Sequence, residues 1–225
     1  MFYLMQYSRR SAARRFGGRS NRLERHWTPG TKRVRYQFDH KEKTRKQILE
    51  AAAAQIRLNG LDGVSIAAIM KGAGLTHGGF YVYFASKTAL TAAAVEYMFD
   101  QALDGLTAAE ERRGEAALAR YVDLYLSPRH RDDMAGGCPV AALMSAVPAA
   151  SVEVRAAYAS GVRRLSNRIA HLGQGGDRQW ALDLLSQMAG SIAFARAIAD
   201  RTASAALLSA ARERLQPRLA PGKGG

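Results

Sequence analysis

The chain has 225 residues, 48% of them hydrophobic, and a formal net charge of +14 at pH 7. That length allows one or two domains with a buried core, but no uninterrupted apolar run reaches the roughly 20 residues of a membrane-spanning helix, and the N-terminus lacks the apolar stretch of a secretory signal. Cys138 is the single cysteine, which excludes an internal disulfide and a cysteine metal cluster and fits a reducing cytoplasm.

Positive charge is concentrated at the N-terminal end. Residues 1–46 carry fourteen Lys and Arg against three Asp and Glu, whereas the remaining residues carry 19 against 16. Residues 1–40 are rich in Arg, Ser and Gly without a sustained helical pattern, which predicts a basic, mostly disordered extension. Three interpretations of it stay open: an unstructured tail or residues from an upstream start site, an arm that follows a DNA backbone, and an organellar presequence.

A compact helical module is predicted over residues 43–105. Apolar residues at helical spacing predict a first helix over about 43–58, which Asn59-Gly60 closes. Ser65 caps a short second helix, and Gly74 makes the turn that follows it.

The third helix of this module begins unusually. Thr76 is a good N-cap, but a His-Gly-Gly run follows it, and two glycines at a helix start cost roughly 1 kcal/mol each against alanine. Close approach of the backbone to another molecule explains that cost, because a helix N-terminus offers N–H groups and partial positive charge to a phosphate. Phe80 and Phe84 anchor the helix on the core. The pattern predicts a helix-turn-helix whose second helix enters the major groove.

The rest of the chain is also predicted to be helical. Ser86 caps a fourth helix, and residues 128–137 form a polar, flexible loop. The later helices are expected at 115–126, 139–147, 151–172, 177–200, and from a Thr202 cap to about 215. The fold class is therefore all-α, an N-terminal three-helix helix-turn-helix module followed by a C-terminal helical ligand-binding and dimerisation domain. The predicted divisions are an extension (1–40), a DNA-binding domain (41–105), a helical domain (106–217) and a disordered tail (218–225).

Short motifs between residues 44 and 99 carry a family resemblance. They are Thr44-Arg45-Lys46-Gln47-Ile48-Leu49-Glu50-Ala51, Asn59-Gly60, Ala73-Gly74-Leu75-Thr76, Gly79-Phe80-Tyr81 with Phe84, and Ser86-Lys87 with Leu90. Through them the chain resembles the TetR/AcrR family of bacterial transcription regulators. The run Gly137-Cys138-Pro139-Val140-Ala141-Ala142-Leu143 is also similar to ligand-domain sequences of some members. The chain departs from the family at Tyr83, where His is frequent, and helix-turn-helix motifs often have a small residue in place of Met70.

The resemblance implies a homodimer that places two recognition helices in successive major grooves of a near-palindromic operator. It implies dimerisation through the helices at 151–172 and 177–200 and an effector pocket within the C-terminal helices. Most members repress and release DNA when a small molecule binds. Neither a cofactor nor a metal is expected.

Eleven residues are the candidate DNA contacts. His77 can hydrogen-bond to a base edge, Val82 can touch a thymine methyl, and the Tyr81 hydroxyl and the Lys87 ammonium can reach phosphates. The alternative for each is an ordinary solvated or capping role. The full set is Lys43, Thr44, Arg45, Thr76, His77, Gly78, Gly79, Tyr81, Val82, Tyr83 and Lys87.

The candidate effector residues are aromatic and sulfur-containing side chains of the C-terminal half. They are Tyr125, Cys138, Met144, Tyr158, Trp180, Met188 and Phe194. At helical spacing such residues are otherwise plain core or dimer interface. Cys138 could sense oxidants or electrophiles if its pKa were lowered, and otherwise it is a small packing residue.

Three classes of function compete. The leading hypothesis is a ligand-responsive repressor in the bacterial cytoplasm, associated with the nucleoid when bound to DNA. The second is a non-specific, architectural nucleic-acid-binding protein driven by the basic extension. The third is an enzyme with Cys138 as nucleophile and His130 as base, but no orienting acid, nucleotide loop or metal-ligand set supports catalysis, so no enzyme is predicted.

Overall fold

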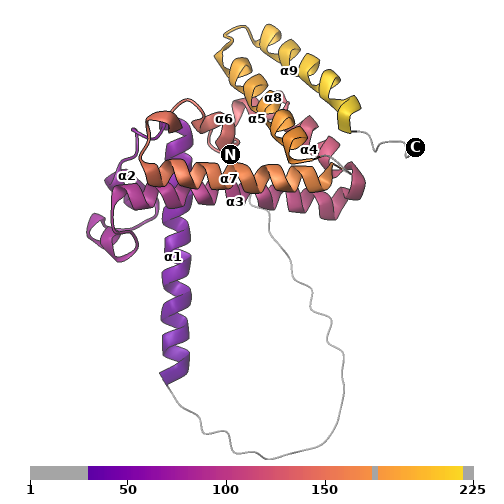
Figure 1. The fold of residues 1–225 in the computed structure, drawn as a ribbon. Helices are drawn as coiled ribbons and strands as arrows, with labels where there is room; N and C mark the ends of the chain where they lie inside the picture. Colours follow the sequence, from indigo (N-terminus) through magenta and orange to yellow (C-terminus); the bar gives the residue numbers. More distant parts are fainter. Residues whose placement is uncertain (1–29, 174–176, 220–225) are drawn as a thin grey trace, which may run out of the picture. The chain divides into compact units, whose positions relative to one another are not determined.

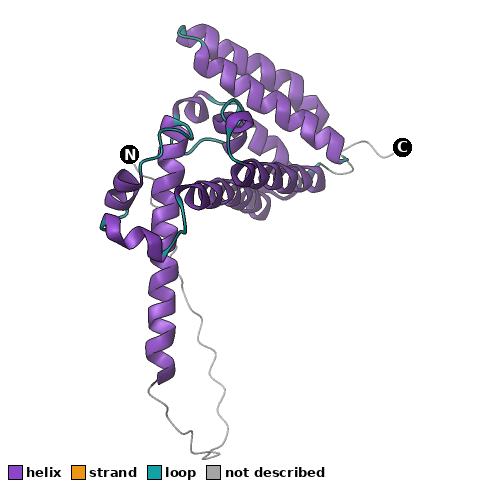
Figure 2. Ribbon diagram, turned by 60° about the vertical axis from the view of Figure 1, so that its left-hand side comes forward, coloured by secondary structure: helices purple, strands orange, loops and turns teal. Residues whose placement is uncertain are grey.

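The computed structural model describes residues 30–173 and 177–219, and within these ranges every regular element is a helix (Figure 2). The described residues from Asp39 onward form one compact unit. None of the helices in the described ranges combines the length and the apolar character needed to cross a bilayer. In chain order the elements (η denotes a 3₁₀-helix) are α1 (Gly30–Asn59), α2 (Ile66–Gly72), η1 (His77–Val82), α3 (Lys87–Arg113), η2 (Gly114–Ala116), α4 (Ala117–Tyr125), α5 (Pro128–Asp132), α6 (Pro139–Leu143), η3 (Val147–Ala149), α7 (Val152–Leu172), α8 (Arg178–Ala197), α9 (Arg201–Leu215) and η4 (Gln216–Leu219).

The first helix begins earlier than predicted. The predicted helix starts near residue 43, whereas α1 starts at Gly30, so residues 30–40 are helical rather than disordered. After Gly30, the segment up to residue 40 contains neither glycine nor proline, so no strong helix breaker interrupts it. Residues 1–29 of the predicted extension lie outside the described residues. Residues 220–225 of the predicted tail also lie outside them, whereas its residues 218 and 219 belong to η4.

Two predicted N-caps and one turn are confirmed. The Ser65 hydroxyl accepts the backbone N–H of Ala68 at 3.3 Å at the start of α2. The Ser86 hydroxyl accepts the N–H of Ala89 at 3.0 Å at the start of α3. Gly74 has φ of +73°, a left-handed conformation in which a Cβ would be strained, so glycine is required at this turn.

The recognition segment, residues 77–82, is a 3₁₀-helix rather than the predicted α-helix. The N–H of Gly79 donates to the Thr76 carbonyl at 3.1 Å, and the N–H of Tyr83 donates to the Phe80 carbonyl at 2.9 Å. The Thr76 side chain makes no capping hydrogen bond here, contrary to the prediction. The two glycines favour this outcome, because they lower helix propensity in a segment too short for a stable α-helix.

Several elements of the C-terminal half differ from the prediction. The helix expected over 139–147 ends at Leu143 as α6, and the helix expected over 177–200 ends at Ala197 as α8. The predicted loop at 128–137 contains α5, because Ser127 caps it and Pro128 occupies the first helical position. Helix α9 is capped by Asp200 rather than by Thr202, since the Asp200 carboxylate accepts the N–H groups of the second and third helical residues.

Helix α3 runs through the predicted domain boundary at 105–106. It buries Leu90, Ala94, Met98, Phe99 and Leu106 along one side. Helix α7 lies along α3 in both views, and α8 and α9 form an adjacent helical hairpin (Figures 1 and 2). The N-terminal helical module and the C-terminal part therefore share one long helix.

Helices α3 and α7 pack tightly against each other at Gly161. A Cβ placed there would lie 2.1 Å from the Phe99 ring, which is fully buried and also packs edge-on against Tyr158 at 5.7 Å between ring centroids. The missing side chain at Gly161 is therefore what allows Phe99 to fill the space between the two helices.

We expect Gly161→Ala to destabilise the protein. The added methyl group must displace the Phe99 ring, and overpacking of this kind costs about 1–3 kcal/mol. Gly105→Ala on α3 is the matched control, since a Cβ there would meet nothing within 4 Å. It should raise stability slightly through helix propensity. Chemical denaturation of both variants measures the difference, and equal unfolding free energies would show that the interface is not tightly packed at Gly161.

Candidate functional site

The recognition segment has one buried and one exposed side. Phe80 is fully buried and stacks with Phe84 at 6.0 Å between centroids. Tyr81 contacts the Phe80 ring edge-on yet is 69% exposed, and Val82 is 61% exposed. His77 is also exposed. Anchoring by Phe80 thus fixes the segment while its outer side chains face away from the core.

The two glycines of the segment are not required by packing within the chain. A Cβ at Gly78 would have no heavy atom within 4 Å, and one at Gly79 would meet only the Met70 methyl at 3.8 Å, an ordinary contact. Neither glycine has a positive φ. Their small size therefore leaves open space at the start of the segment. Met70, where a small residue is common, is fully buried beneath it.

Tyr83 and Lys87 follow the segment and differ in exposure. Tyr83 is half-buried, and its ring packs against the core. Lys87 is exposed as the first residue of α3, a position where a positive charge is unfavourable to the helix dipole. The Lys87 ammonium is thus available to an anion outside the chain.

Helix α1 contributes two of its three candidate contacts to the surface. Lys43 and Arg45 are exposed, and the Arg45 guanidinium lies over the Phe84 ring at 5.2 Å from the centroid. That cation–π contact holds Arg45 next to the end of the recognition segment. Thr44 is instead buried, and its hydroxyl donates to the His40 carbonyl at 2.9 Å, so it is not presented to a phosphate.

The candidate effector residues are not gathered in one place. Tyr125 and Cys138 are buried neighbours, and the half-buried Tyr158 donates a long hydrogen bond of 3.4 Å to the Val140 carbonyl. Burial raises the pKa of the Cys138 thiol, which favours the neutral form. A neutral buried thiol is weakly reactive, contrary to the requirement for an electrophile sensor.

The other candidates lie elsewhere. Met188 is fully buried in the core, and Trp180 packs against Gly173, where a Cβ would lie 2.4 Å from the indole ring. Met144 and Phe194 are exposed.

His130 connects the end of α4 to the start of α6. Its Nδ1 lies 2.7 Å from the Tyr125 carbonyl, and its Nε2 accepts the backbone N–H of Cys138 at 3.2 Å. A carbonyl only accepts and an N–H only donates, so this geometry requires a neutral imidazole with its proton on Nδ1. Both ring nitrogens are thereby occupied by backbone groups, and neither is placed to deprotonate the Cys138 thiol.

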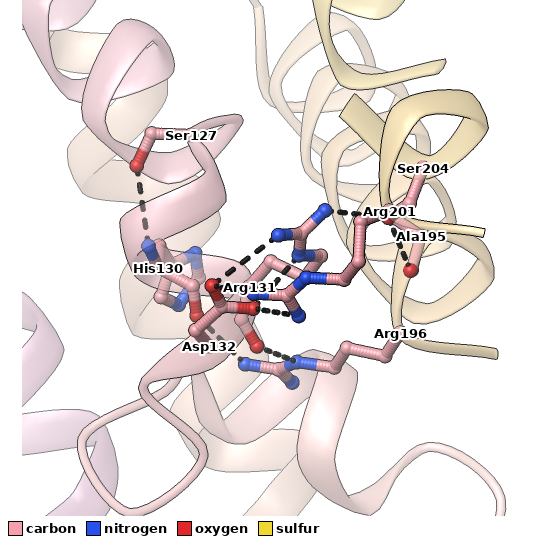
Figure 3. A network of polar contacts seen from close by, with 8 residues as sticks. All are labelled: Ser127, His130, Arg131, Asp132, Ala195, Arg196, Arg201 and Ser204. Atoms are coloured by element: carbon pink, nitrogen blue, oxygen red, sulfur yellow. Dashed lines mark hydrogen bonds and ion pairs between the residues drawn. The ribbon is translucent and has the colours of Figure 1, made fainter. Parts of the chain in front are cut away.

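A polar network ties α5 to α8 and α9 (Figure 3). The buried Arg131 donates to the Ser204 hydroxyl at 2.8 Å, and it pairs with Asp132, which also binds Arg201 at 2.6 Å. These two guanidinium groups lower the pKa of Asp132 to about 2. Arg196 donates to the carbonyl of Arg131 at 3.2 Å and to that of His130 at 3.1 Å. The network fixes the segment from which His130 projects.

Sequence reasoning did not single out Arg57, a buried cation. It lies on α1, is only 8% exposed, and donates to the Gln101 side chain at 2.9 Å and to the Ala135 carbonyl at 3.4 Å. Desolvation lowers its pKa. A signal was present, because Arg57 directly follows the buried Ile56 in a mostly apolar stretch of helix, but charged residues there are usually solvated.

Comparison with known proteins gives consistent matches. The model of the bacterial regulatory proteins, tetR family, matches residues 48–94. An uncharacterised HTH-type transcriptional regulator of Bacillus subtilis (strain 168), YvdT, is 46% identical over 59 residues, which span 26% of this chain and 30% of that protein. NemR from E. coli, in its reduced form, has a TM-score of 0.67 at 20% identity, covering 78% of this chain and 96% of NemR. A TetR-family regulator from Agrobacterium tumefaciens has a TM-score of 0.66 at 21% identity, covering 79% and 98%.

The fold and the recognition segment define an all-helical protein of the helix-turn-helix class. Residues 48–94 match the TetR family of bacterial regulatory proteins, and the fold of the chain is similar to that of solved TetR-family regulators. The resemblance drawn from the short motifs is thereby confirmed.

The locked tautomer of His130 predicts a pH-dependent stability. Burial lowers the pKa of His130, whereas the unfolded chain binds a proton with a pKa near 6.5. The unfolded state therefore takes up more protons as the pH falls below about 6.5, and the unfolding free energy should decrease there. Carboxylates with a lowered pKa, such as Asp132, lose their contribution to the unfolding free energy only below about pH 4.

Denaturation curves between pH 7.5 and 5 test this prediction. His130→Gln should flatten the pH dependence, whereas His171→Gln, at an exposed position, should leave it unchanged. Parallel curves for wild type and His130→Gln would mean that His130 is not held neutral.

Proposed function

We propose that this protein is a dimeric, ligand-responsive DNA-binding repressor of bacterial transcription that recognises a near-palindromic operator. The observation that carries the proposal is the recognition segment. Phe80 fixes it from inside, the outer side chains at 77, 81 and 82 are exposed, and two glycines leave room for close backbone approach. Exposed cations at Arg45 and Lys87 flank it.

The exposed groups have complementary roles in this proposal. His77 and Val82 read base edges, and the Tyr81 hydroxyl and Lys87 bind phosphates. Backbone groups at Gly78 and Gly79 approach the DNA closely. Lys43 and Arg45 add phosphate contacts, while Tyr83 mainly supports the segment from below. Thr76 contributes through its hydroxyl, which no capping hydrogen bond occupies.

Self-association is proposed through α8 together with α9. Helix α7, within the predicted 151–172 element, already packs along α3, so less of it is free to bind a partner. Helix α8, within 177–200, exposes Phe194 (69%), which lies in a groove of about 410 Å³ between α8 and α9. A second copy of the same groove would cover this apolar surface.

The alternative remains a non-specific DNA-binding protein driven by the basic N-terminal end, because residues 1–46 hold most of the excess positive charge. Selection of bound fragments from genomic DNA at moderate salt separates the two. A short palindrome near few promoters supports the repressor, and it should survive deletion of residues 1–29. Binding without a motif that disappears as salt rises would favour the alternative.

Substitutions in the site distinguish positioning from base recognition. Lys87→Ala should weaken binding to all sequences and reduce the slope of log affinity against log salt by about 1, because one phosphate contact is lost. Arg120→Ala removes one exposed positive charge on α4 and should leave the affinity nearly unchanged.

His77→Ala should alter base preference with little change in the salt slope. An unchanged base preference on randomised DNA would remove His77 from the set of recognition residues.

The dimer proposal predicts that Phe194→Glu produces monomers. A carboxylate in the centre of the α8–α9 surface would have to be desolvated on association. Val152→Glu is the control, because Val152 is equally exposed but lies at the start of α7. Sedimentation at micromolar concentration measures the effect. Monomers formed by Val152→Glu alone would instead place the interface on α7.

A further inference from the structure

We infer that the buried cluster of Arg57, Tyr125, Cys138 and Arg196 is a binding site for the carboxylate of a small organic acid. The inference rests on the proposed effector-controlled function and specifies the chemical class of the effector. It also brings one residue of α1 into the ligand site, so that binding would act directly on the helix that carries part of the DNA-binding surface.

Two polar groups of the cluster have no hydrogen-bond partner within the part of the chain that the structure describes. They are the Tyr125 hydroxyl and the Arg57 Nε, on residues that are 4% and 8% exposed. Each is a donor removed from water, and an unsatisfied buried donor is costly. The polar neighbour of the Tyr125 hydroxyl is the Cys138 thiol, which is only a weak acceptor, and Arg57 donates to the Ala135 carbonyl, three residues before Cys138. Both donors therefore adjoin the segment that leads into Cys138.

The cluster also contains two positive charges without a matching carboxylate. Arg57 donates to Gln101 and Ala135, and Arg196 donates to two backbone carbonyls, so all their acceptors are neutral. Neither guanidinium forms an ion pair with any described carboxylate. Asp133 is the acid that acts on both, but it is exposed and its Oδ1 accepts the N–H of Gly136 at 2.9 Å.

The backbone is shaped to bring these cations to the same segment. A Cβ at Gly137 would lie 2.7 Å from Arg196 Nη2, so the glycine lets this guanidinium contact the turn before Cys138. Arg57 reaches the same turn from α1 through Ala135. A carboxylate has two acceptor oxygens and one negative charge, so it can accept hydrogen bonds from both a guanidinium N–H and a phenolic hydroxyl.

The surroundings favour an organic acid over an inorganic anion. The Tyr121 ring lies 5.9 Å from the Tyr125 ring, and the Tyr125 ring lies 4.6 Å from His130. Burial raises the pKa values of Tyr121, Tyr125 and Tyr158, so all three are neutral and their rings present apolar surface. An apolar body can pack among these rings while its carboxylate faces Arg57.

Titration calorimetry on the purified full chain tests the inference without DNA. The probes are acetate, benzoate and octanoate, which share the carboxylate and differ in apolar size, with benzamide as a neutral analogue of benzoate. We expect at least one carboxylate to bind with one site per chain, and the best carboxylate to bind at least about tenfold more tightly than its neutral amide analogue.

Variants assign the binding to the cluster. Tyr125→Phe removes only the unpartnered hydroxyl, so it should keep the fold and weaken carboxylate binding several-fold. Arg57→Met should weaken binding at least about tenfold, whereas Arg120→Met, at an exposed site on α4, should not change it. Melting curves confirm that each variant is folded, and Tyr125→Phe decides the matter if Arg57→Met does not fold.

Each outcome decides something different. Three results would overturn the inference. They are no heat of binding with any carboxylate up to tens of millimolar, binding of benzamide as tight as that of benzoate, and carboxylate affinity unchanged in Tyr125→Phe. Specific operator binding in such a case would leave the proposed function intact. If the protein bound carboxylates but selected no DNA motif, the ligand site would be supported and the proposal of a specific repressor would be overturned.

Discussion

The contact on which the rest of the structure depends is the seating of Phe99 of α3 against Gly161 of α7. It brings two long helices together at a distance that no side chain at position 161 would allow. Ion pairs from Arg164 to Asp100 and from Arg168 to Glu110 extend the contact along both helices. Helix α3 in turn holds α1, since the Tyr97 hydroxyl donates to Glu50 at 3.0 Å. A displacement of α7 relative to α3 would therefore reach the DNA-binding part through a single rigid element.

The connection between the proposed DNA-binding surface and the proposed ligand cluster is short. Arg57 touches Gln101 on α3 and the turn at Ala135, and the same turn leads into Cys138 and the His130 contact. The Arg131–Asp132–Arg201 network holds the other end of α5 against α9 (Figure 3). The segment between α5 and α6 is thus held at both ends by charged groups. A ligand that altered the contacts of the groups at one end would therefore also shift the conformation favoured at the other end.

Much of the fold could be predicted from the sequence because the helix signals are local. Ser65, Ser86 and Gly74 act within four residues of their own position, and their roles follow from side-chain chemistry and a positive φ. The 3₁₀ form of the recognition segment depends on the balance between glycine flexibility and anchoring by Phe80, which a periodic pattern does not express. The burial of Thr44 and the junction formed by Arg57 depend on contacts far apart in the chain, such as Arg57 with Ala135. No pairing of this kind can be deduced from spacing alone.

The 3₁₀ geometry of residues 77–82 has a consequence for how DNA would be engaged. Its few short-range hydrogen bonds and two glycines leave the backbone less restrained than a regular helix of the same length. Docking such a segment into a groove requires it to give up that freedom, so part of the contact free energy is offset by lost conformational entropy. On the proposed operator, the same freedom would let the segment adapt its backbone to half-sites of slightly different groove width. Tolerance of imperfect operator symmetry, at the expense of peak affinity, is the behaviour that this geometry favours.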